Sequence, residues 1–228
     1  MSILTTHPFD IQARNMVETQ LRRRGIHDTR VLEAMRQVPR HEFVPANLVG
    51  AAYDDRPLPI GERETISQPY IVAAMTQAVG VVPGDKALEI GGGSGYQAAI
   101  LAHLGATVWM IEINPRLAES ARKRLQRLGY RNVEVIAGDG SEGFAAHAPY
   151  NVVIVSAATP RVSPVLLGQL AEGARLVAPV GNLHYQELLS FSKQGGQILT
   201  HYLDPCQFVP LIGKGGWQEV RNPEDHKR

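Results

Sequence analysis

Apolar and polar positions follow two different periods along the chain, and the middle part is the most regular. Between residues 81 and 181, short runs rich in apolar and β-branched residues alternate with longer segments of helical period. The short runs predict strands at 86–90, 107–112, 133–137, 151–156 and 175–179. The longer segments predict helices at 96–104, 115–128 and 164–170. Strands that alternate with helices are typical of an α/β fold with a doubly wound, mostly parallel sheet.

The first 80 residues show a helical pattern. Three apolar residues follow one another at intervals of four: Ala13, Val17 and Leu21. Asp10 is a suitable N-cap for this predicted helix, and Gly25 can end it. A second short helix is expected after Asp28, another favoured capping residue. Its apolar side has three residues: Val31, Leu32 and Met35. Residues 53–64, which contain two prolines and Gly61, predict an irregular connection.

The pattern changes again after residue 181, where strand-like runs follow without a helical period between them. The runs are 187–192, 197–203 and 207–212, and the breaks between them are Gly195-Gly196 and Asp204-Pro205. Such a succession predicts an antiparallel addition to the sheet. We therefore expect an N-terminal helical segment at 1–80, an α/β core with its antiparallel strands at 81–217, and a loose charged tail at 218–228.

Composition and charge narrow the classes of partner. The chain has 228 residues, of which 44% are hydrophobic, so most of it is expected to fold. Lysine and arginine number 23 against 22 acidic residues, a net charge of +1 that favours neither a nucleic acid nor a membrane surface as partner. The single cysteine, Cys206, cannot form an internal disulfide, and the first residues do not resemble a secretory signal. A cytoplasmic location is expected.

A glycine-rich segment follows the first predicted strand of the core and opens a helix. Its glycines are Gly91, Gly93 and Gly95, and glycine lets the backbone approach a bound ligand closely. Glu112 ends the next predicted strand, 21 residues after Gly91, where an acid can accept hydrogen bonds from ribose hydroxyls. The two features together favour a nucleoside-containing cofactor over an ordinary tight turn.

Two residues beside the glycines bear on which cofactor this is. The dinucleotide fingerprint needs a small residue at position 96, where this chain has Tyr96. Glu89 would repel a pyrophosphate, but it could hold the ammonium or sulfonium group of S-adenosylmethionine. Farther along, Asp139 could accept from an adenine amino group, and the backbone N–H of Gly140 could donate to a ring nitrogen. An ordinary Asp-Gly turn is the alternative for this pair.

With these segments, the chain as a whole resembles the protein-L-isoaspartate O-methyltransferases. These are class I S-adenosylmethionine enzymes with a Rossmann-like fold that repair damaged aspartyl and asparaginyl residues. The resemblance covers about residues 10 to 217. It includes the glycine segment and the following stretches: 16–24, 40–45 (Arg-His-Glu-Phe-Val-Pro), 66–70 (Ile-Ser-Gln-Pro-Tyr), 138–140, 148–150, 169–170, 173–181 and 208–211. Two residues depart from the family pattern, Asn151 in place of aspartate and Gly92 in place of threonine or serine.

The resemblance implies an activity and a set of site residues. It implies methyl transfer from S-adenosylmethionine to the free carboxylate of L-isoaspartyl residues in proteins and peptides, with no metal and no obligate partner. Ser67 is the implied catalytic residue. The implied cofactor-binding residues are Ile66, Ser67, Gln68, Pro69, Tyr70, Glu89, Gly91, Gly93, Gly95, Glu112, Ile113, Asp139 and Gly140. The substrate-binding residues are expected to be Ser67, Val180, Gly181, Val209, Pro210 and Leu211.

The chemistry of carboxylate methylation agrees with the residues available. An aspartyl-type acid has a pKa of about 3.9, so it is already ionised at neutral pH and needs no general base. None of the eight histidines has a recognisable nucleophile-base pairing. Ser67 is also placed to cap a helix that has Pro69 at an early position, and the helix N-terminus could then face an anion.

Three other functions remain open from the sequence. Pro205-Cys206 is superficially similar to the Pro-Cys nucleophile of cytosine C5 methyltransferases, although it lies among the C-terminal strands. An amino-methylating Asn/Asp-Pro-Pro-Tyr motif is absent after residues 151–155. An NAD oxidoreductase is disfavoured by Tyr96, and a catalytically silent binding module would bind the cofactor without turnover.

Overall fold

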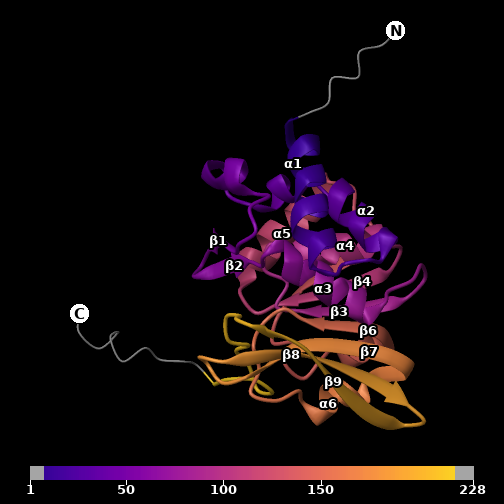
Figure 1. Ribbon diagram of the computed structural model, residues 1–228. Helices are drawn as coiled ribbons and strands as arrows, with labels where there is room; N and C mark the ends of the chain where they lie inside the picture. Colours follow the sequence, from indigo (N-terminus) through magenta and orange to yellow (C-terminus); the bar gives the residue numbers. More distant parts are fainter. Residues whose placement is uncertain (1–7, 219–228) are drawn as a thin grey trace.

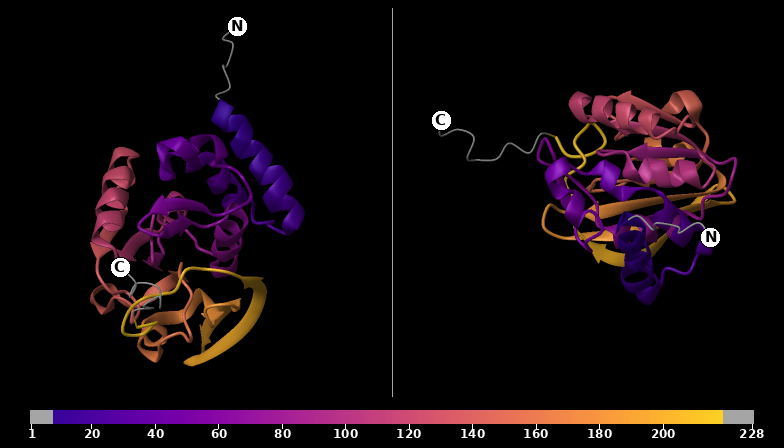
Figure 2. Two further views of the ribbon diagram at one scale, coloured as in Figure 1. Left: turned by 90° about the vertical axis from the view of Figure 1, so that its left-hand side faces the viewer. Right: turned by 90° about the horizontal axis from the view of Figure 1, so that it is seen from above.

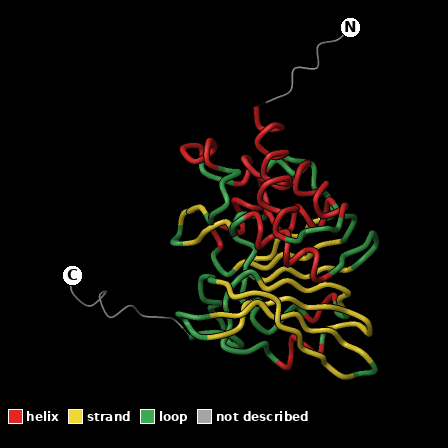
Figure 3. The backbone as a smooth tube through the Cα atoms, viewed as in Figure 1, coloured by secondary structure: helices red, strands yellow, loops and turns green. Residues whose placement is uncertain are grey.

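The computed structural model describes residues 8–218. Its core is a seven-stranded sheet with strand order β5-β4-β3-β6-β7-β8-β9. The strands are β3 (Lys86–Ile90), β4 (Thr107–Glu112), β5 (Val133–Ala137), β6 (Tyr150–Val155), β7 (Leu170–Gly181), β8 (Gln186–Gln194) and β9 (Gln197–Cys206). The first five are parallel, and β8 and β9 are antiparallel additions. Figure 3 shows the strands side by side as one stack. The expected α/β fold is confirmed.

Helices cover the two faces of the sheet unequally. The helices are α1 (Pro8–Met16), α2 (Thr29–Gln37), α3 (Pro69–Val79), α4 (Tyr96–His103), α5 (Pro115–Arg127) and α6 (Pro164–Gly168). Figure 1 shows α1 to α5 gathered above the sheet and the short α6 below it. Alternate strand residues face opposite ways, so that Ala87 packs with the α1–α5 layer and Leu88 with the α6 face. In the left-hand view of Figure 2, α1 lies on the far side of the helical layer from the C-terminal strands.

The N-terminal segment packs on the same core as the sheet. A π-helical turn (Val17–Leu21) and a 3-10 turn (Arg22–Arg24) continue α1, and Gly25 ends the run with φ +90°. Asp10 lies inside the first turn of α1, so the prediction that it is the N-cap is wrong. Asp28 caps α2 as predicted, because its side chain accepts from the backbone N–H of Arg30 at 2.9 Å.

The predicted irregular connection contains a hairpin. Strands β1 (Leu58–Gly61) and β2 (Glu64–Ile66) pair antiparallel. Their turn holds Glu62 and Arg63 at φ +53° and +64°, a conformation usually taken by Asn-Gly or Asp-Gly. Because Glu and Arg give no turn signal, the sequence pattern did not reveal the hairpin.

The C-terminal strands differ from their predicted bounds at two places. The strand β9 continues through Asp204 and Pro205. Proline has no N–H to donate, but β9 is an edge strand, so one of its sides needs no hydrogen bonds to a neighbouring strand. Residues 207–212 do not form the predicted strand. They lie across the end of the sheet beyond β6, where Leu211 donates its N–H to the carbonyl of Ala158 at 2.7 Å. The predicted charged tail lies outside the described residues, apart from residue 218.

Candidate active site

The glycine segment, Glu112 and residues 138–140 meet at the carboxyl ends of neighbouring strands. Glu112 is the last residue of β4, Gly91 follows β3, and Gly138 follows β5. Strand β3 lies between β4 and β6, so the chain proceeds from it in both directions across the sheet. In open α/β sheets this switch point is the usual place for a ligand.

Three neighbouring cavities form a groove along this edge. The first runs from Glu112 and Gly138 to Leu211, and the second runs from Glu89 to Ser67 under the start of α3. These two are narrow, at about 50 and 30 Å³, and the β1–β2 hairpin supplies part of their walls. The third opens beside Ser67 and has a volume of about 570 Å³. Thr65 and Ser156 line all three, so the cavities adjoin one another.

The three glycines adopt backbone conformations that other residues avoid. Gly91, Gly93 and Gly95 have φ angles of +79°, +51° and +84°. The carboxylate of Glu112 holds this loop, because one oxygen accepts from the N–H of Gly93 and the other from the N–H of Asn114, both at 2.8 Å. Each oxygen retains a further lone pair. Glu112 therefore shapes the loop, in addition to its predicted contact with a ribose.

Three carboxyl groups face the narrow part of the groove. Glu89 is 1% exposed; its Oε1 accepts from the Ser156 hydroxyl at 3.2 Å, and its Oε2 has no partner in residues 8–218. Burial raises the pKa of Glu89 to about 8, and Glu112 contributes in the same direction. Burial and Glu112 also raise the pKa of Glu64. Such an environment disfavours further negative charge and suits a cation.

Of the predicted adenine-binding pair, Gly140 lines the groove and Asp139 does not. Gly138 and Gly140 line the first cavity. Asp139 does not, and its two oxygens accept from the backbone N–H groups of Ser141 and Lys214, each at 2.8 Å. Those bonds lower the pKa of Asp139 despite its partial burial. The predicted bond from Asp139 to an adenine amino group therefore depends on lone pairs that the loop leaves free.

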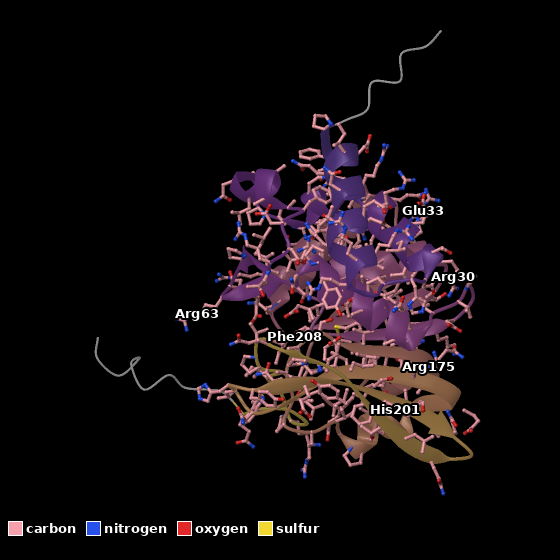
Figure 4. All side chains as sticks on the ribbon, in the orientation of Figure 1. Arg30, Glu33, Arg63, Arg175, His201 and Phe208 are labelled. Atoms are coloured by element: carbon pink, nitrogen blue, oxygen red, sulfur yellow. The ribbon has the colours of Figure 1, made fainter. Side chains whose placement is uncertain are left out.

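The 570 Å³ cavity has a polar mouth formed by segments far apart in the sequence. The guanidinium of Arg24 lies 3.5 Å from the ring centroid of Tyr70 and pairs with Asp55 at 3.0 Å. Tyr70 donates its hydroxyl to Asp204 at 3.2 Å. Phe208 forms another part of the wall, and Figure 4 shows it where the helical layer meets the sheet.

Ser67 lies at the junction of the second and third cavities. The prediction that its side chain caps α3 is wrong, because Gln68 occupies the N-cap position and the helix begins at Pro69 without a side-chain cap bond. Within residues 8–218 the Ser67 hydroxyl has no hydrogen-bond partner, whereas its carbonyl accepts from Arg40 at 2.7 Å. The hydroxyl is thus free to contact a ligand in the groove.

Other predicted residues divide between the cavities. Ile66 lines the second cavity, Ile113 the first, and Gln68 and Tyr70 the third. Pro69 and Gly95 line none of the three; both lie behind the groove wall.

The predicted substrate contacts are only partly brought together. Val209 lines the first and third cavities, but Pro210 and Leu211 line only the first, on the side predicted for the cofactor. Val180 and Gly181 line none of the three; they end β7, where Gly181 donates its N–H to Thr159. The structure therefore does not bring Val180 and Gly181 to Ser67.

Many wall residues were not predicted, among them Glu64, Thr65, Ser156 and Asp204. Ser156 directly follows β6, and its position at the end of a parallel strand is a signal that the sequence does offer. Glu64, Thr65 and Asp204 depend on the hairpin and on the unbroken course of β9, and nothing in the sequence pattern indicates either.

The two departures from the family pattern lie in different surroundings. Asn151 is at the amino end of β6, where its side chain accepts from the N–H of Lys86 at 2.9 Å. That is the end of the sheet opposite the groove, so this departure does not touch the groove. Gly92 lies against Met110, whose side chain occupies the space that a Cβ at position 92 would need.

We expect Gly92→Ser to lower the free energy of unfolding by roughly 1–3 kcal/mol, because the new side chain overlaps Met110. Adding Met110→Ala should recover part of that loss, so the two changes will not be additive. Gly50→Ser is the matched control, since nothing lies within 4 Å of a Cβ there. Urea unfolding of the wild type, Gly92→Ser, Met110→Ala, the double variant and Gly50→Ser measures the effect. Equal losses for Gly92→Ser and Gly50→Ser would contradict it.

Cys206 is not suited to be the nucleophile that a cytosine C5 methyltransferase needs. Burial raises the pKa of this thiol to about 12, and Asp204 and Glu187 add to the effect. A thiol that stays protonated at neutral pH is a poor nucleophile.

Among residues 8–218 no group of three His, Cys, Asp or Glu side chains is arranged to hold a metal ion. In the same range, no helix combines the length and the apolar character needed to cross a bilayer.

Comparisons with known proteins identify relatives along nearly the whole chain. A family model described as protein-L-isoaspartate(D-aspartate) O-methyltransferase matches residues 12–216. A relative named protein-L-isoaspartate O-methyltransferase from Methanoculleus marisnigri is 51% identical over 93% of this chain and 96% of its own length. One of the same name from Koribacter versatilis is 52% identical, with the same coverage of both chains.

Solved structures agree at the level of the fold. A protein-L-isoaspartate O-methyltransferase superimposes with a TM-score of 0.80 at 29% identity over 89% of this chain, which spans 66% of that longer one. A Plasmodium falciparum protein of the same description, solved with S-adenosyl-L-homocysteine, gives 0.76 at 24% identity over 91% of this chain and 99% of its own. The family match and the relatives of about 50% identity cover nearly the whole chain. The chain therefore belongs to the protein-L-isoaspartate(D-aspartate) O-methyltransferase family.

Proposed function

We propose that this chain transfers a methyl group from S-adenosylmethionine to the free carboxylate of L-isoaspartyl residues in damaged proteins and peptides, which begins their repair. The observation that carries the proposal is the position of Ser67. It lies where an acid-lined narrow groove meets a 570 Å³ cavity that is open to an extended chain. A cationic donor suits the narrow, acid-lined part of the groove, and a peptide suits the 570 Å³ cavity.

The residues of the narrow groove fit S-adenosylmethionine. The unpartnered Oε2 of Glu89 is a suitable acceptor for the ammonium group of the donor. Glu112 and the backbone of residues 138–140 are suited to the ribose and the adenine. When bound, S-adenosylmethionine supplies a methyl group whose bond to sulfur breaks, with the electron pair left on sulfur, as a carboxylate oxygen forms the new bond.

The protein's part in this reaction is placement. The isoaspartyl carboxylate is ionised at neutral pH, so the chain has no proton to remove. Holding two reactants in line can account for about 7–11 kcal/mol of a barrier. Ser67 contributes one hydroxyl donor to the carboxylate, which orients an oxygen without suppressing its nucleophilicity as an arginine fork would.

The test is methyl ester formation on a peptide that contains L-isoaspartate, beside the same peptide with ordinary aspartate. We expect turnover on the first alone. Binding of S-adenosylhomocysteine without turnover on either peptide would favour a silent binding module, and tight binding of NAD would favour an oxidoreductase.

We expect Ser67→Ala to lower kcat/KM for the isoaspartyl peptide about tenfold, as the loss of one hydrogen bond to a charged group implies. The affinity for S-adenosylhomocysteine should change less than kcat/KM does. Ser120→Ala, on the exposed side of α5, is the control. Full activity of Ser67→Ala would remove Ser67 from the catalytic site.

A further inference from the structure

Arg40 is a buried cation without an acidic partner. Its side chain is 0% exposed, and none of the ion pairs within residues 8–218 includes it. It belongs to the Arg-His-Glu-Phe-Val-Pro stretch, to which the proposed function gives no role. Burying a charge without a counterion is costly, so such a residue needs a physical reason.

The contacts of Arg40 lead to the active site. Its Nη2 donates to the carbonyl of Ser67 and its Nε to the carbonyl of Ala52, each at 2.7 Å. The guanidinium carbon lies 4.9 Å from the ring centroid of Tyr96, the first residue of α4 after the glycine loop. Arg40 therefore fixes the backbone of Ser67 and joins the substrate side of the groove to the cofactor side.

The charges around the groove show what this cation offsets. Glu64 and Glu112 on the cofactor side, together with Asp204 in the large cavity, disfavour an incoming carboxylate. Arg24 is the cation that lines the large cavity, and its charge is paired with Asp55. In the described part of the chain, Arg40 is the cation that donates a hydrogen bond to Ser67, and no carboxylate pairs with it.

We propose that Arg40 is a positioning residue for the substrate carboxylate: it fixes the backbone of Ser67, and its unpaired charge makes the Ser67 end of the cavity favour an anion over a neutral group. Arg40 acts from behind Ser67, since it lines none of the three cavities itself. The inference rests on the proposed function and names the group that attracts the carboxylate.

The experiment compares two peptides that differ only in charge. One carries the free isoaspartyl carboxylate, and the other carries a carboxamide at the same position. Calorimetry measures the Kd of each in the presence of S-adenosylhomocysteine for the wild type, Arg40→Met and Arg40→Lys. Arg30→Met is the control, because Arg30 also donates to a backbone carbonyl, that of Val81, and lies well away from Phe208 in Figure 4.

We expect Arg40→Met to bind the carboxylate peptide about tenfold more weakly, as the loss of one partly screened charge implies, and to bind the carboxamide peptide as the wild type does. Arg40→Lys should keep the preference for the carboxylate but lower kcat, since an ammonium cannot hold both carbonyls in the same geometry. The affinity for S-adenosylhomocysteine should not change in either variant.

The outcomes separate this inference from the proposed function. Equal weakening of both peptides, or of neither, would overturn the role of Arg40. If Arg40→Met does not fold, Arg40→Lys decides, and a loss of the carboxylate preference in that variant would count against the charge. If the wild type does not methylate the isoaspartyl peptide at all, the proposed function itself fails.

Discussion

Replacing Glu112 with glutamine is expected to weaken the binding of S-adenosylhomocysteine about a hundredfold. The carboxylate accepts from the N–H groups of Gly93 and Asn114, both at 2.8 Å, and it is 5% exposed. A glutamine amide places its NH₂ group against one of these donors, so that one bond to a charged acceptor is lost and a donor is left unpaired. Each such loss costs about 1.5–3 kcal/mol. The glycine loop then loses its anchor.

Calorimetric titration with S-adenosylhomocysteine measures this effect. Glu119→Gln is the matched control, because Glu119 lies on the exposed side of α5 and pairs with Arg122 and Lys123. Circular dichroism at the working temperature separates lost binding from lost fold. An unchanged affinity in a folded Glu112→Gln variant would show that the loop does not depend on this carboxylate.

The second large effect is expected at Glu89, where affinity for the donor should depend on pH. Burial raises the pKa of Glu89 to about 8, so in the free protein the group is mostly protonated at pH 7. To pair with the ammonium group of the donor it must release that proton. The affinity should therefore rise up to about tenfold per pH unit below pH 8 and level off above it.

Glu89→Gln should abolish this pH dependence and weaken binding of S-adenosylmethionine about a hundredfold at pH 8, as the loss of a buried charged acceptor implies. Calorimetry in two buffers of different ionisation enthalpy should show proton release on binding to the wild type at pH 7 and none for the variant. The same slope with pH in both proteins would assign the titration to another group.

The same substitution should have the opposite effect on the stability of the free protein. Between pH 4.5 and about pH 8 the folded state holds a proton on Glu89 that the unfolded state has lost, so stability falls as the pH rises through this window. Glutamine removes that dependence. Glu89→Gln should therefore raise the Tm at pH 8, by roughly 2–4 °C for each kcal/mol recovered, and change it little at pH 5.

These expectations describe a site with its charges separated along one groove. Carboxyl groups of Glu64, Glu89 and Glu112 lie on the side suited to a cation. A buried guanidinium lies behind Ser67, on the side suited to an anion. Opposite charges on the two reactants would then draw each to its own end of the groove, with Ser67 between them.

Much of the parallel core follows from local sequence. The strands predicted at 86–90, 107–112 and 133–137 have those bounds in the structure. A buried parallel strand is a short, nearly continuous apolar run, so it can be recognised in the sequence without knowing which strands lie beside it. The glycine loop was also recognisable from local sequence. Its turn needs φ angles above +50°, which few residues other than glycine adopt, so the glycines themselves indicate the turn.

Predictions failed where the outcome depended on contacts between distant segments. Residues 207–212 have a strand-like pattern, yet they cross the end of β6 because Ala158 offers backbone groups there. Val180 was expected in the substrate wall, but it pairs with Thr159 and lines none of the three cavities. Ser67 does not cap α3, because the helix begins at Pro69 and Gln68 occupies the N-cap position.

The sequence by itself therefore determined the parallel core of the sheet and the position of the glycine loop, because each depends on a short pattern of residue types. Ser67 was predicted as the catalytic residue from the family resemblance. Only the tertiary structure decided which cavities Ser67 joins, why Glu89 is protonated and what Arg40 holds. Those properties come from burial and from contacts over long sequence separations, which a local pattern does not contain.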